Sequence, residues 1–143
     1  MLIQNREITH PHVMLLVRNA EDELLERYPD QVPSPLDATA QFVVAYVIGR
    51  PVGCGALALI SDTQAEVKRM YVLPDHRRTG VARRVLKALE RRAATAGIET
   101  VILETGVRQG EALGLYEAAG YERTEPYGEY IGNPYSVCFV KKL

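Results

Sequence analysis

The sequence predicts one α/β (α+β) domain over residues 1–143, with a mixed, mostly antiparallel sheet flanked by helices. Three strand-like runs follow one another between residues 41 and 73 with short turns between them, which predicts an antiparallel meander. An amphipathic helix then separates two apolar strands, which predicts a right-handed crossover between parallel strands. A length of 143 residues suits a single domain with its own hydrophobic core.

The N-terminal half is predicted to hold a strand, a helix and the meander. Apolar residues recur at helical spacing from His12 to Tyr28, and the three prolines of Pro29–Pro35 end this helix and form a rim to a site. Gly49 and Arg50 form a two-residue type II′ turn, since glycine suits its first position. The predicted strands are Leu2–Ile8, Gln41–Ile48, Pro51–Ile60 and Ala65–Leu73.

The C-terminal half is predicted to be led by a helix over Val81–Ala96. Its apolar residues form one stripe, and Gly97 follows at the position where helices commonly end. A second, shorter helix, Ala112–Ala119, is stopped by Gly120. The remaining predicted strands are Thr100–Glu104, Tyr121–Glu125 and Ser136–Lys141, with a loop at 126–135.

Composition and charge narrow the functional class. The net charge of −1 and the hydrophobic content of 47% are ordinary for a globular protein, and neither indicates nucleic acid or a membrane as partner. No apolar leader or membrane-spanning run is visible, so we expect a cytoplasmic location. Cys54 and Cys138 lie in apolar runs and are expected to be reduced and buried. The three histidines form no ligand grouping with them, so we expect no metal.

A short loop ahead of the long helix predicts an anion site. The first amides of a helix lack intrahelical partners, and the helix dipole favours a negative charge there. Gly80 permits a close approach of the backbone, and two arginines add donors. Residues 77–92 carry seven basic side chains and one acidic one, which suits a phosphorylated ligand, although a solvated helix face would account for the more distant ones equally well. The loop residues are Arg77, Arg78, Thr79, Gly80, Val81 and Ala82.

Three segments resemble the GCN5-related N-acetyltransferase (GNAT) superfamily. Residues 66–72, Glu-Val-Lys-Arg-Met-Tyr-Val, are similar to the family's fourth strand. Residues 77–82 match its Arg/Gln-x-x-Gly-x-Gly/Ala loop, and residues 112–121 match its A-x-x-L-Y-x-x-x-G-F/Y helix. The resemblance implies a sheet that splays between the fourth and fifth strands. It also implies acetyl-CoA as co-substrate, with pantetheine on the backbone of Met70, Tyr71 and Val72 and pyrophosphate on the amides of residues 78–82.

The resemblance also implies catalytic residues. Tyr116 matches the tyrosine that protonates or hydrogen-bonds the thiolate of CoA, although a core position would suit it equally. Glu66 lies where some members place a general base; alternatively it is an edge-strand carboxylate, solvated or paired with Lys68 or Arg69. A backbone N–H near Met70 would donate to the thioester oxygen. Gln109 stands where many members have a CoA-binding asparagine.

Neither cysteine matches a nucleophile position, so we expect direct acetyl transfer to a primary amine of a small molecule in a ternary complex. The alternatives are acetylation of a protein lysine or N-terminus, and a non-catalytic acyl-CoA binding module. Acids and tyrosines would suit a cationic amine, whereas Arg50 and Arg69 would select an acidic acceptor. A homodimer through the apolar Val137–Val140 is a further hypothesis. The residues expected to line the acceptor pocket are Tyr28, Glu104, Tyr127, Glu129 and Tyr130.

Overall fold

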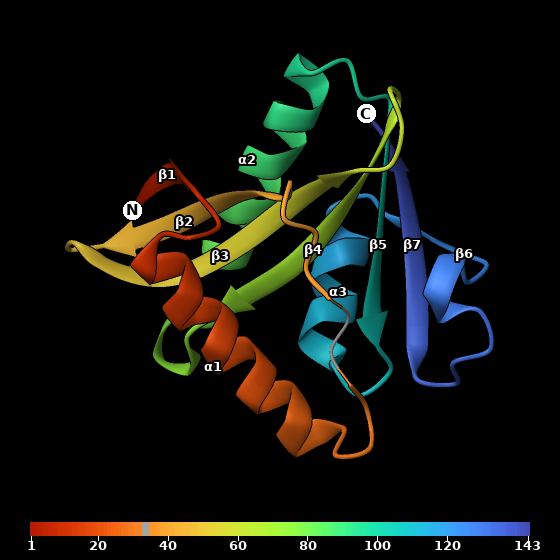
Figure 1. The fold of residues 1–143 in the computed structure, drawn as a ribbon, viewed down its shortest axis with the longest axis horizontal. Helices are drawn as coiled ribbons and strands as arrows, with labels where there is room; N and C mark the ends of the chain where they lie inside the picture. Colours follow the sequence, from red (N-terminus) through yellow and green to blue (C-terminus); the bar gives the residue numbers. More distant parts are fainter. Residues whose placement is uncertain (33–34) are drawn as a thin grey trace.

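A seven-stranded sheet crosses the whole molecule in the computed structural model, which describes residues 1–32 and 35–143 (Figure 1). The strand order is β1-β2-β3-β4-β5-β7-β6. Only the β4–β5 pair is parallel, and every other neighbouring pair is antiparallel, which confirms the predicted mixed sheet. The strands are β1 (Leu2–Arg6), β2 (Gln41–Val47), β3 (Arg50–Leu59), β4 (Gln64–Val72), β5 (Thr100–Gly106), β6 (Glu122–Thr124) and β7 (Ser136–Lys142).

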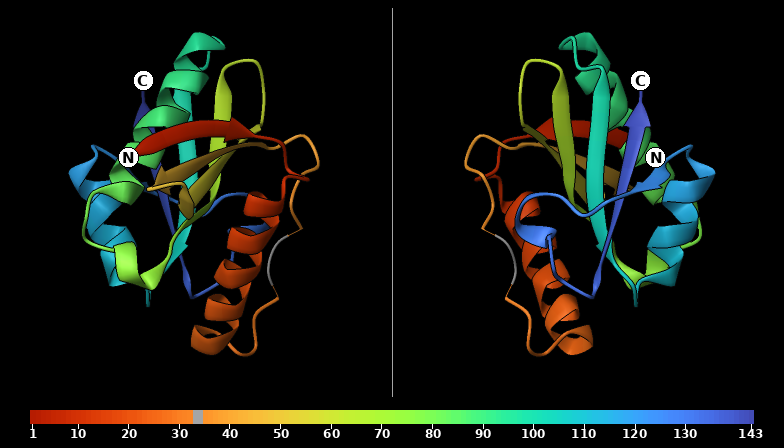
Figure 2. Two further views of the ribbon diagram at one scale, coloured as in Figure 1. Left: turned by 90° about the vertical axis from the view of Figure 1, so that its left-hand side faces the viewer. Right: turned by 90° about the vertical axis from the view of Figure 1, so that its right-hand side faces the viewer.

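Helices cover both faces of the sheet. α1 (Pro11–Arg27) packs on one face, and α2 (Val81–Thr95) and α3 (Gly110–Ala118) pack on the other (Figure 2). Each helix buries its apolar side against the sheet, because that side holds most of its apolar surface. Short 3₁₀ turns occupy Pro74–His76 and Gly128–Tyr130. Within the described residues, no helix is long and apolar enough to span a bilayer.

α2 carries both the apolar stripe and the basic residues that the sequence indicates. The middle of its apolar stripe is fully buried, with Val85, Leu86 and Leu89 in the larger core, whereas Ala82 is half-buried and Ala96 is exposed. Of its basic residues, Arg92 has a structural role, because its guanidinium donates to the Gln41 side chain and to the carbonyl of Phe42. The helix is thereby tied to β2, and only part of the basic run is available to a ligand.

The parallel strands β4 and β5 separate part-way along their length. Their pairing ends at Val67 and Leu103, whereas β4 continues to Val72 and β5 to Gly106. The backbone of residues 68–72 therefore has no strand partner on the β5 side. This splay is the one implied by the resemblance.

A bulge interrupts β4 at the splay. The β3–β4 register shifts between Cys54 and Ala56, and Arg69 takes a left-handed conformation with φ of 56°. Gly55 faces this bulge, and a Cβ there would lie 2.7 Å from Met70 Sδ and 2.8 Å from Leu89 Cδ1. Glycine is thus needed because α2 and the bulged strand approach β3 closely.

The turn between β2 and β3 differs from the sequence prediction. The predicted type II′ turn at Gly49 and Arg50 is wrong, because Val47 pairs with Arg50 and the turn residues are Ile48 and Gly49. Both have positive φ, 49° and 72°, which is the type I′ pattern that matches strand twist. Ile48 is fully exposed, and the correct pairing of two buried strands outweighs the strain of its left-handed backbone.

The C-terminal strands fill the sheet in an order that differs from the chain order. β7 inserts between β5 and β6, and Phe139 on β7 is buried against the α2 and α3 side. The apolar run Val137–Val140 is therefore covered within the chain. The dimer was expected because this apolar run needs to be covered, and the chain itself covers it. A homodimer therefore stays a prediction without this support. Both cysteines are buried free thiols, as predicted, and burial raises the pKa of Cys54 to about 12.

Candidate active site

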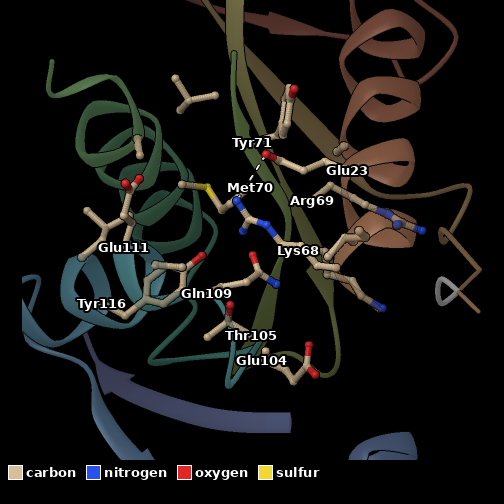
Figure 3. A pocket seen from close by; sticks show the side chains of 18 of the residues that line it. Glu23, Lys68, Arg69, Met70, Tyr71, Glu104, Thr105, Gln109, Glu111 and Tyr116 are labelled. Carbon is tan, nitrogen blue, oxygen red and sulfur yellow. Dashed lines mark hydrogen bonds and ion pairs between the residues drawn. The ribbon is translucent and has the colours of Figure 1, made fainter. Parts of the chain in front are cut away.

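The splay opens into a large cleft of about 1100 Å³. Its lining comes from the end of α1, the unpaired part of β4, the end of β5, the first turns of α2 and α3, and the segment 129–135 (Figure 3). Elements distant in the sequence meet here because the parallel strands end on the same side of the sheet. A cleft of this kind can hold one elongated ligand and a smaller second one.

The start of α2 forms the anion-binding end of the cleft. Gly80 has φ of 87°, and the Arg84 N–H donates to its carbonyl at 3.2 Å, so the helix begins directly after it. No side chain caps this end of the helix in the described structure. The amides of Val81 and Ala82 are left to a ligand, and the helix dipole adds a positive potential.

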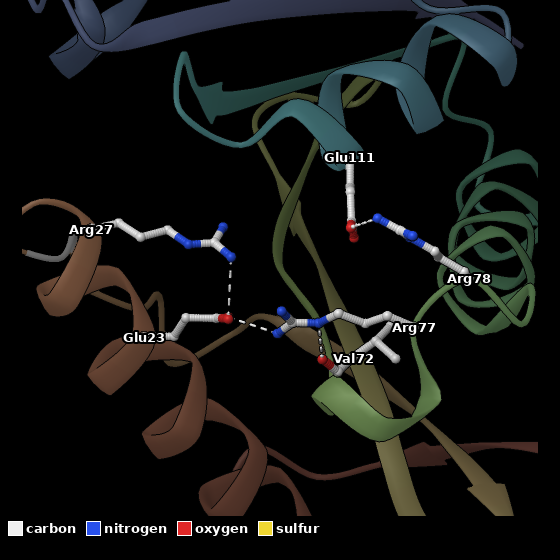
Figure 4. Close-up of polar contacts among 6 residues, drawn as sticks. All are labelled: Glu23, Arg27, Val72, Arg77, Arg78 and Glu111. Carbon is white, nitrogen blue, oxygen red and sulfur yellow. Dashed lines mark hydrogen bonds and ion pairs between the residues drawn. The ribbon is translucent and has the colours of Figure 1, made fainter.

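Arg77 and Arg78 point in different directions (Figure 4). Arg77 Nε donates to the Val72 carbonyl at 2.9 Å, and Nη2 donates to Glu23 Oε2 at 2.8 Å. Its hydrogen bond to Glu23 is the largest of the causes that raise the pKa of Arg77. The guanidinium therefore connects the end of β4 to α1, a contact that the sequence analysis did not foresee.

Arg78 stays at the surface of the same end. Its side chain is 83% exposed, and its ion pair with Glu111 at 3.1 Å joins the α2 loop to the first turn of α3. Exposed ion pairs of this kind contribute little to stability. The guanidinium can leave Glu111 for an anion at small cost, and Thr79 beside it donates its hydroxyl to the His76 carbonyl.

The unpaired backbone of β4 forms one wall of the cleft. Met70, Tyr71 and Val72 all line it, with Met70 packed toward α2 and Tyr71 packed toward α1. Because Arg77 Nε donates to the Val72 carbonyl, that carbonyl already has a partner, and the unpaired backbone groups of β4 end there. An extended ligand with amide groups can pair with such a strand edge as an added strand does.

Tyr116 projects from α3 into the cleft (Figure 3). The residue is only 5% exposed, and its ring lies 6.0 Å from that of Tyr121 and 5.8 Å from that of Phe139. The hydroxyl has no hydrogen-bond partner among the described residues. Burial, followed by the charge of Glu104, raises the pKa of Tyr116. The phenol therefore keeps its proton at neutral pH and can donate it to a group in the cleft.

Glu66 lies on the α1 face of β4 within a polar cluster. Its Oε2 accepts hydrogen bonds from the hydroxyls of Tyr127 at 3.0 Å and Tyr130 at 3.3 Å. Its Oε1 is 3.9 Å from Lys68 Nζ, and the residue is 7% exposed. Of the alternatives that the sequence left open, solvation at an edge strand is wrong, because β4 is central in the sheet; an ion pair with Lys68 is present.

Glu104 is a second carboxylate on the same face of the splayed strands. It follows Leu103, the last β5 residue paired with β4, and the Ser136 hydroxyl donates to its Oε2 at 2.6 Å. Burial raises the pKa of Glu104, and the charges of Glu66 and Glu129 add to the effect. From the sequence, Glu104 was expected to line the acceptor pocket but was given no catalytic role. The signal was available in the strand pattern, since Glu104 interrupts an apolar strand at its open end.

The remaining predicted site residues are mostly brought to the cleft. Gln109 is the residue before α3 and directs its side chain inward (Figure 3). Tyr28, Glu129, Tyr130 and Arg69 line the cleft as well. Tyr127 lines a neighbouring cavity of about 520 Å³ that shares Glu66 with the main cleft.

Of the predicted pocket residues, Tyr127 lines the neighbouring cavity and not the main cleft, and Arg50 lines neither. Arg50 opens β3 directly after the hairpin turn and is exposed. Arg108 and Tyr135 line it and were missed by the sequence analysis. They lie outside regular strands and helices, where periodicity carries no signal.

Comparison with known proteins identifies the family. Residues 11–121 match the model of the acetyltransferase (GNAT) family. The chain belongs to the GNAT family. The IAA acetyltransferase of Azospirillum brasilense is 36% identical over 140 residues, covering 92% of this chain and 90% of that protein. The family and its fold make this chain an acetyl-CoA-dependent N-acetyltransferase, as the sequence predicts.

Solved structures agree with this fold over nearly the whole chain. A candidate acyl-CoA N-acyltransferase from Klebsiella pneumoniae superposes with a TM-score of 0.87 at 29% identity, covering 99% of this chain and 97% of that one. A GNAT acetyltransferase from Elizabethkingia anophelis, solved with acetyl-CoA bound, gives a TM-score of 0.76 at 16% identity, covering 99% and 97% of the two chains.

Proposed function

We propose that this protein transfers the acetyl group of acetyl-CoA directly to a primary amine of a small molecule. The observation that carries the proposal is the single cleft that joins an uncapped helix N-terminus, an unpaired strand edge, a protonated tyrosine and two carboxylates. The first two features fit the pyrophosphate and the pantetheine arm of acetyl-CoA. The last three fit proton transfer around a thioester.

The residues of this chain divide the binding of acetyl-CoA between them. The amides of Arg78, Thr79, Gly80, Val81 and Ala82 would hold the pyrophosphate, and the exposed Arg78 side chain would add charge. Met70, Tyr71 and Val72 would offer backbone groups to the pantetheine arm, and Gln109 would reach it from α3. Arg77 contributes by fixing the end of β4 against α1.

Proton transfer requires a base on the acceptor side of the cleft. A lysine-like amine with a pKa of about 10.4 is almost wholly protonated at neutral pH, so the incoming ammonium must lose a proton before attack. We assign this role to Glu104, because its raised pKa brings a carboxylate closer to the pH at which it works. Glu66, which the resemblance suggested, is the second candidate; its Oε2 already accepts hydrogen bonds from two tyrosine hydroxyls.

Tyr116 completes the transfer on the other side. As the amine nitrogen bonds to the acetyl carbon, the carbon–sulfur bond breaks and the sulfur of CoA needs a proton. The Tyr116 hydroxyl would supply it, and the backbone N–H near Met70 would donate to the thioester oxygen. The products are the amide and CoA with its thiol restored. The ammonium nitrogen loses two protons on the way: the one taken by Glu104 before attack returns to solvent, and the one released after the carbon–nitrogen bond forms restores the Tyr116 hydroxyl.

The acceptor side favours a small molecule over a protein. Asn133 Nδ2 donates to Gln31 Oε1 at 3.2 Å, which joins the segment 129–135 to the chain that follows α1. Tyr28, Tyr130 and Tyr135 line the cleft together with Gln31 and Asn133. A contact between these two segments narrows the acceptor side of the cleft, which favours a small acceptor over a folded protein surface.

An amine panel tests the proposal. The purified protein is incubated with acetyl-CoA and single amines, and the release of CoA thiol is compared with the amount of acetylated amine found by mass spectrometry. Equal amounts of both products, dependent on the amine, are expected. Acetyl-CoA binding without transfer to any small amine, but with transfer to a peptide, would overturn it in favour of protein acetylation.

A further inference from the structure

Arg108 is an exposed cation of the cleft whose side chain is oriented by two aromatic rings and a carbonyl. Its guanidinium carbon lies 5.2 Å from the ring centre of Tyr28 and 4.9 Å from that of Tyr135. The two rings are 5.6 Å apart and tilted by 66°. Nη1 donates to the Arg27 carbonyl at 2.7 Å, and the backbone N–H of Arg108 donates to the Tyr28 hydroxyl at 2.9 Å. The guanidinium is therefore oriented before any ligand arrives.

Arg108 has no carboxylate beside it among the described residues, and the same holds for Arg83 at the start of α2, which lines the anion-binding end of the cleft. Within the described parts of the chain, no carboxylate oxygen lies within ion-pair distance of Arg108. Only one of its five side-chain N–H donors is used, on the Arg27 carbonyl. Four other cations lining the cleft form ion pairs, Arg27 and Arg77 with Glu23, Lys68 with Glu66, and Arg78 with Glu111.

Arg108 and Glu104 bracket one short stretch of the acceptor wall. Gly106 lies between them at the end of β5, and the Tyr28 ring packs directly where a Cβ of Gly106 would be. Glu104 and Arg108 are four residue steps apart, so their Cα atoms are separated by at most about 13 Å at ~3.3 Å per residue, and both residues line the cleft. A carboxylate that can accept a proton and a guanidinium that can bind an anion thus lie within reach of one small molecule.

We propose that Arg108 binds a carboxylate of the acceptor, so that the substrate is an amine that also carries a carboxylate. The inference rests on the proposed function, since it names the substrate class for the same cleft. The planar guanidinium matches the two oxygens of a carboxylate, and the Tyr28 and Tyr135 rings beside it, with the Arg27 carbonyl, orient this exposed side chain. The amine of the acceptor is then directed to Glu104 and the acetyl group, and its carboxylate to Arg108.

The test compares acceptors that differ only in the carboxylate. The ω-amino acids with one to five methylenes are assayed beside the n-alkylamines of equal length, so that the series itself finds the best spacing between amine and carboxylate. Wild type is expected to favour the best amino acid over its matched alkylamine by about 10- to 100-fold in kcat/KM, mainly through KM. In Arg108→Gln this ratio falls toward one, and Arg108→Lys keeps part of it. Equal ratios in wild type and Arg108→Gln would overturn the proposal.

A matched control and a binding readout separate this proposal from the proposed function. Arg123 also lies over an aromatic ring, 5.9 Å from Phe139, but outside the cleft, so Arg123→Gln should keep the wild-type ratio. Butyrate binding to the CoA-saturated protein is followed by NMR. Binding that is lost in Arg108→Gln supports the site even if no amine is acetylated; absent binding, or binding equal in both proteins, overturns it. Transfer to alkylamines without dependence on Arg108 leaves the proposed function standing alone.

Discussion

Replacing Tyr116 by phenylalanine separates catalysis from folding. The ring packs against Tyr121 and Phe139, whereas the hydroxyl faces the cleft and has no described protein partner. The substitution keeps the ring contacts and removes only a hydroxyl that bonds to no protein group. The free energy of unfolding should change by less than about 0.5 kcal/mol, which is about 2 °C or less in Tm for a domain of this size.

The rate should change far more than the stability. The leaving group is a thiolate whose parent thiol has a pKa near 8.5, so its departure gains from a proton donor held at the sulfur. General acid catalysis of this kind contributes about 10²- to 10⁴-fold. We therefore expect kcat to fall by that factor in Tyr116→Phe, equivalent to about 3 to 5 kcal/mol of activation free energy.

Tyr121 provides the matched control. Its hydroxyl donates to Glu90 Oε2 at 2.8 Å on the α2 side of the core, away from the cleft. Tyr121→Phe should keep kcat but cost about 1 to 2 kcal/mol of stability, because a hydrogen bond to a charged group is lost. Initial rates of thiol release at saturating substrates and thermal melts are measured for both variants. A Tyr116→Phe enzyme within threefold of wild-type kcat would refute the assignment of Tyr116 as the acid.

Two other substitutions test the acceptor wall. Glu104→Gln should abolish most activity and yet raise Tm near pH 8, but should not raise it below about pH 4. Burial raises the folded pKa of Glu104, so the ionised carboxylate lowers stability only as the pH rises through that pKa. An equal change in Tm at both pH values would contradict this. Gly106→Ala should lower stability by about 1 to 3 kcal/mol, because the new methyl group meets the Tyr28 ring. Its control, Gly114→Ala on the open side of α3, should raise stability by about 0.5 to 1 kcal/mol through helix propensity, and the two are compared by denaturant unfolding.

The sequence predicted those parts of the site that are formed by a single helix or loop, because their geometry depends on neighbouring residues in the chain. Gly80 and the helix start at Val81 follow from local backbone chemistry, and Tyr116 follows from a motif within α3. The order of the meander was also accessible, because each strand pairs with its neighbour in the chain.

Features that depend on contacts between distant segments were not accessible. The insertion of β7 between β5 and β6 depends on pairing across more than thirty residues, and no local pattern records it. Arg77 was expected at the phosphates, but its guanidinium is bound to Glu23, 54 residues earlier in the chain. The left-handed conformation of the exposed Ile48 was not predicted, because the register of the paired strands outweighs the preference of a single isoleucine for extended backbone.

The assignment of the anion site is tested most directly by titrating acetyl-CoA into wild type, Gly80→Asn and Gly80→Asp by calorimetry. Asparagine and aspartate have the same shape and tolerate the left-handed backbone at Gly80 better than other side chains, and a Cβ there meets no atom within 4 Å. The two variants therefore differ in one charge beside the start of α2. We predict that the aspartate variant binds at least about tenfold more weakly than the asparagine variant, while its Tm is equal or slightly higher, because its carboxylate repels the pyrophosphate but interacts favourably with the helix dipole. Equal affinity of the two variants, or no binding by wild type, would contradict the account.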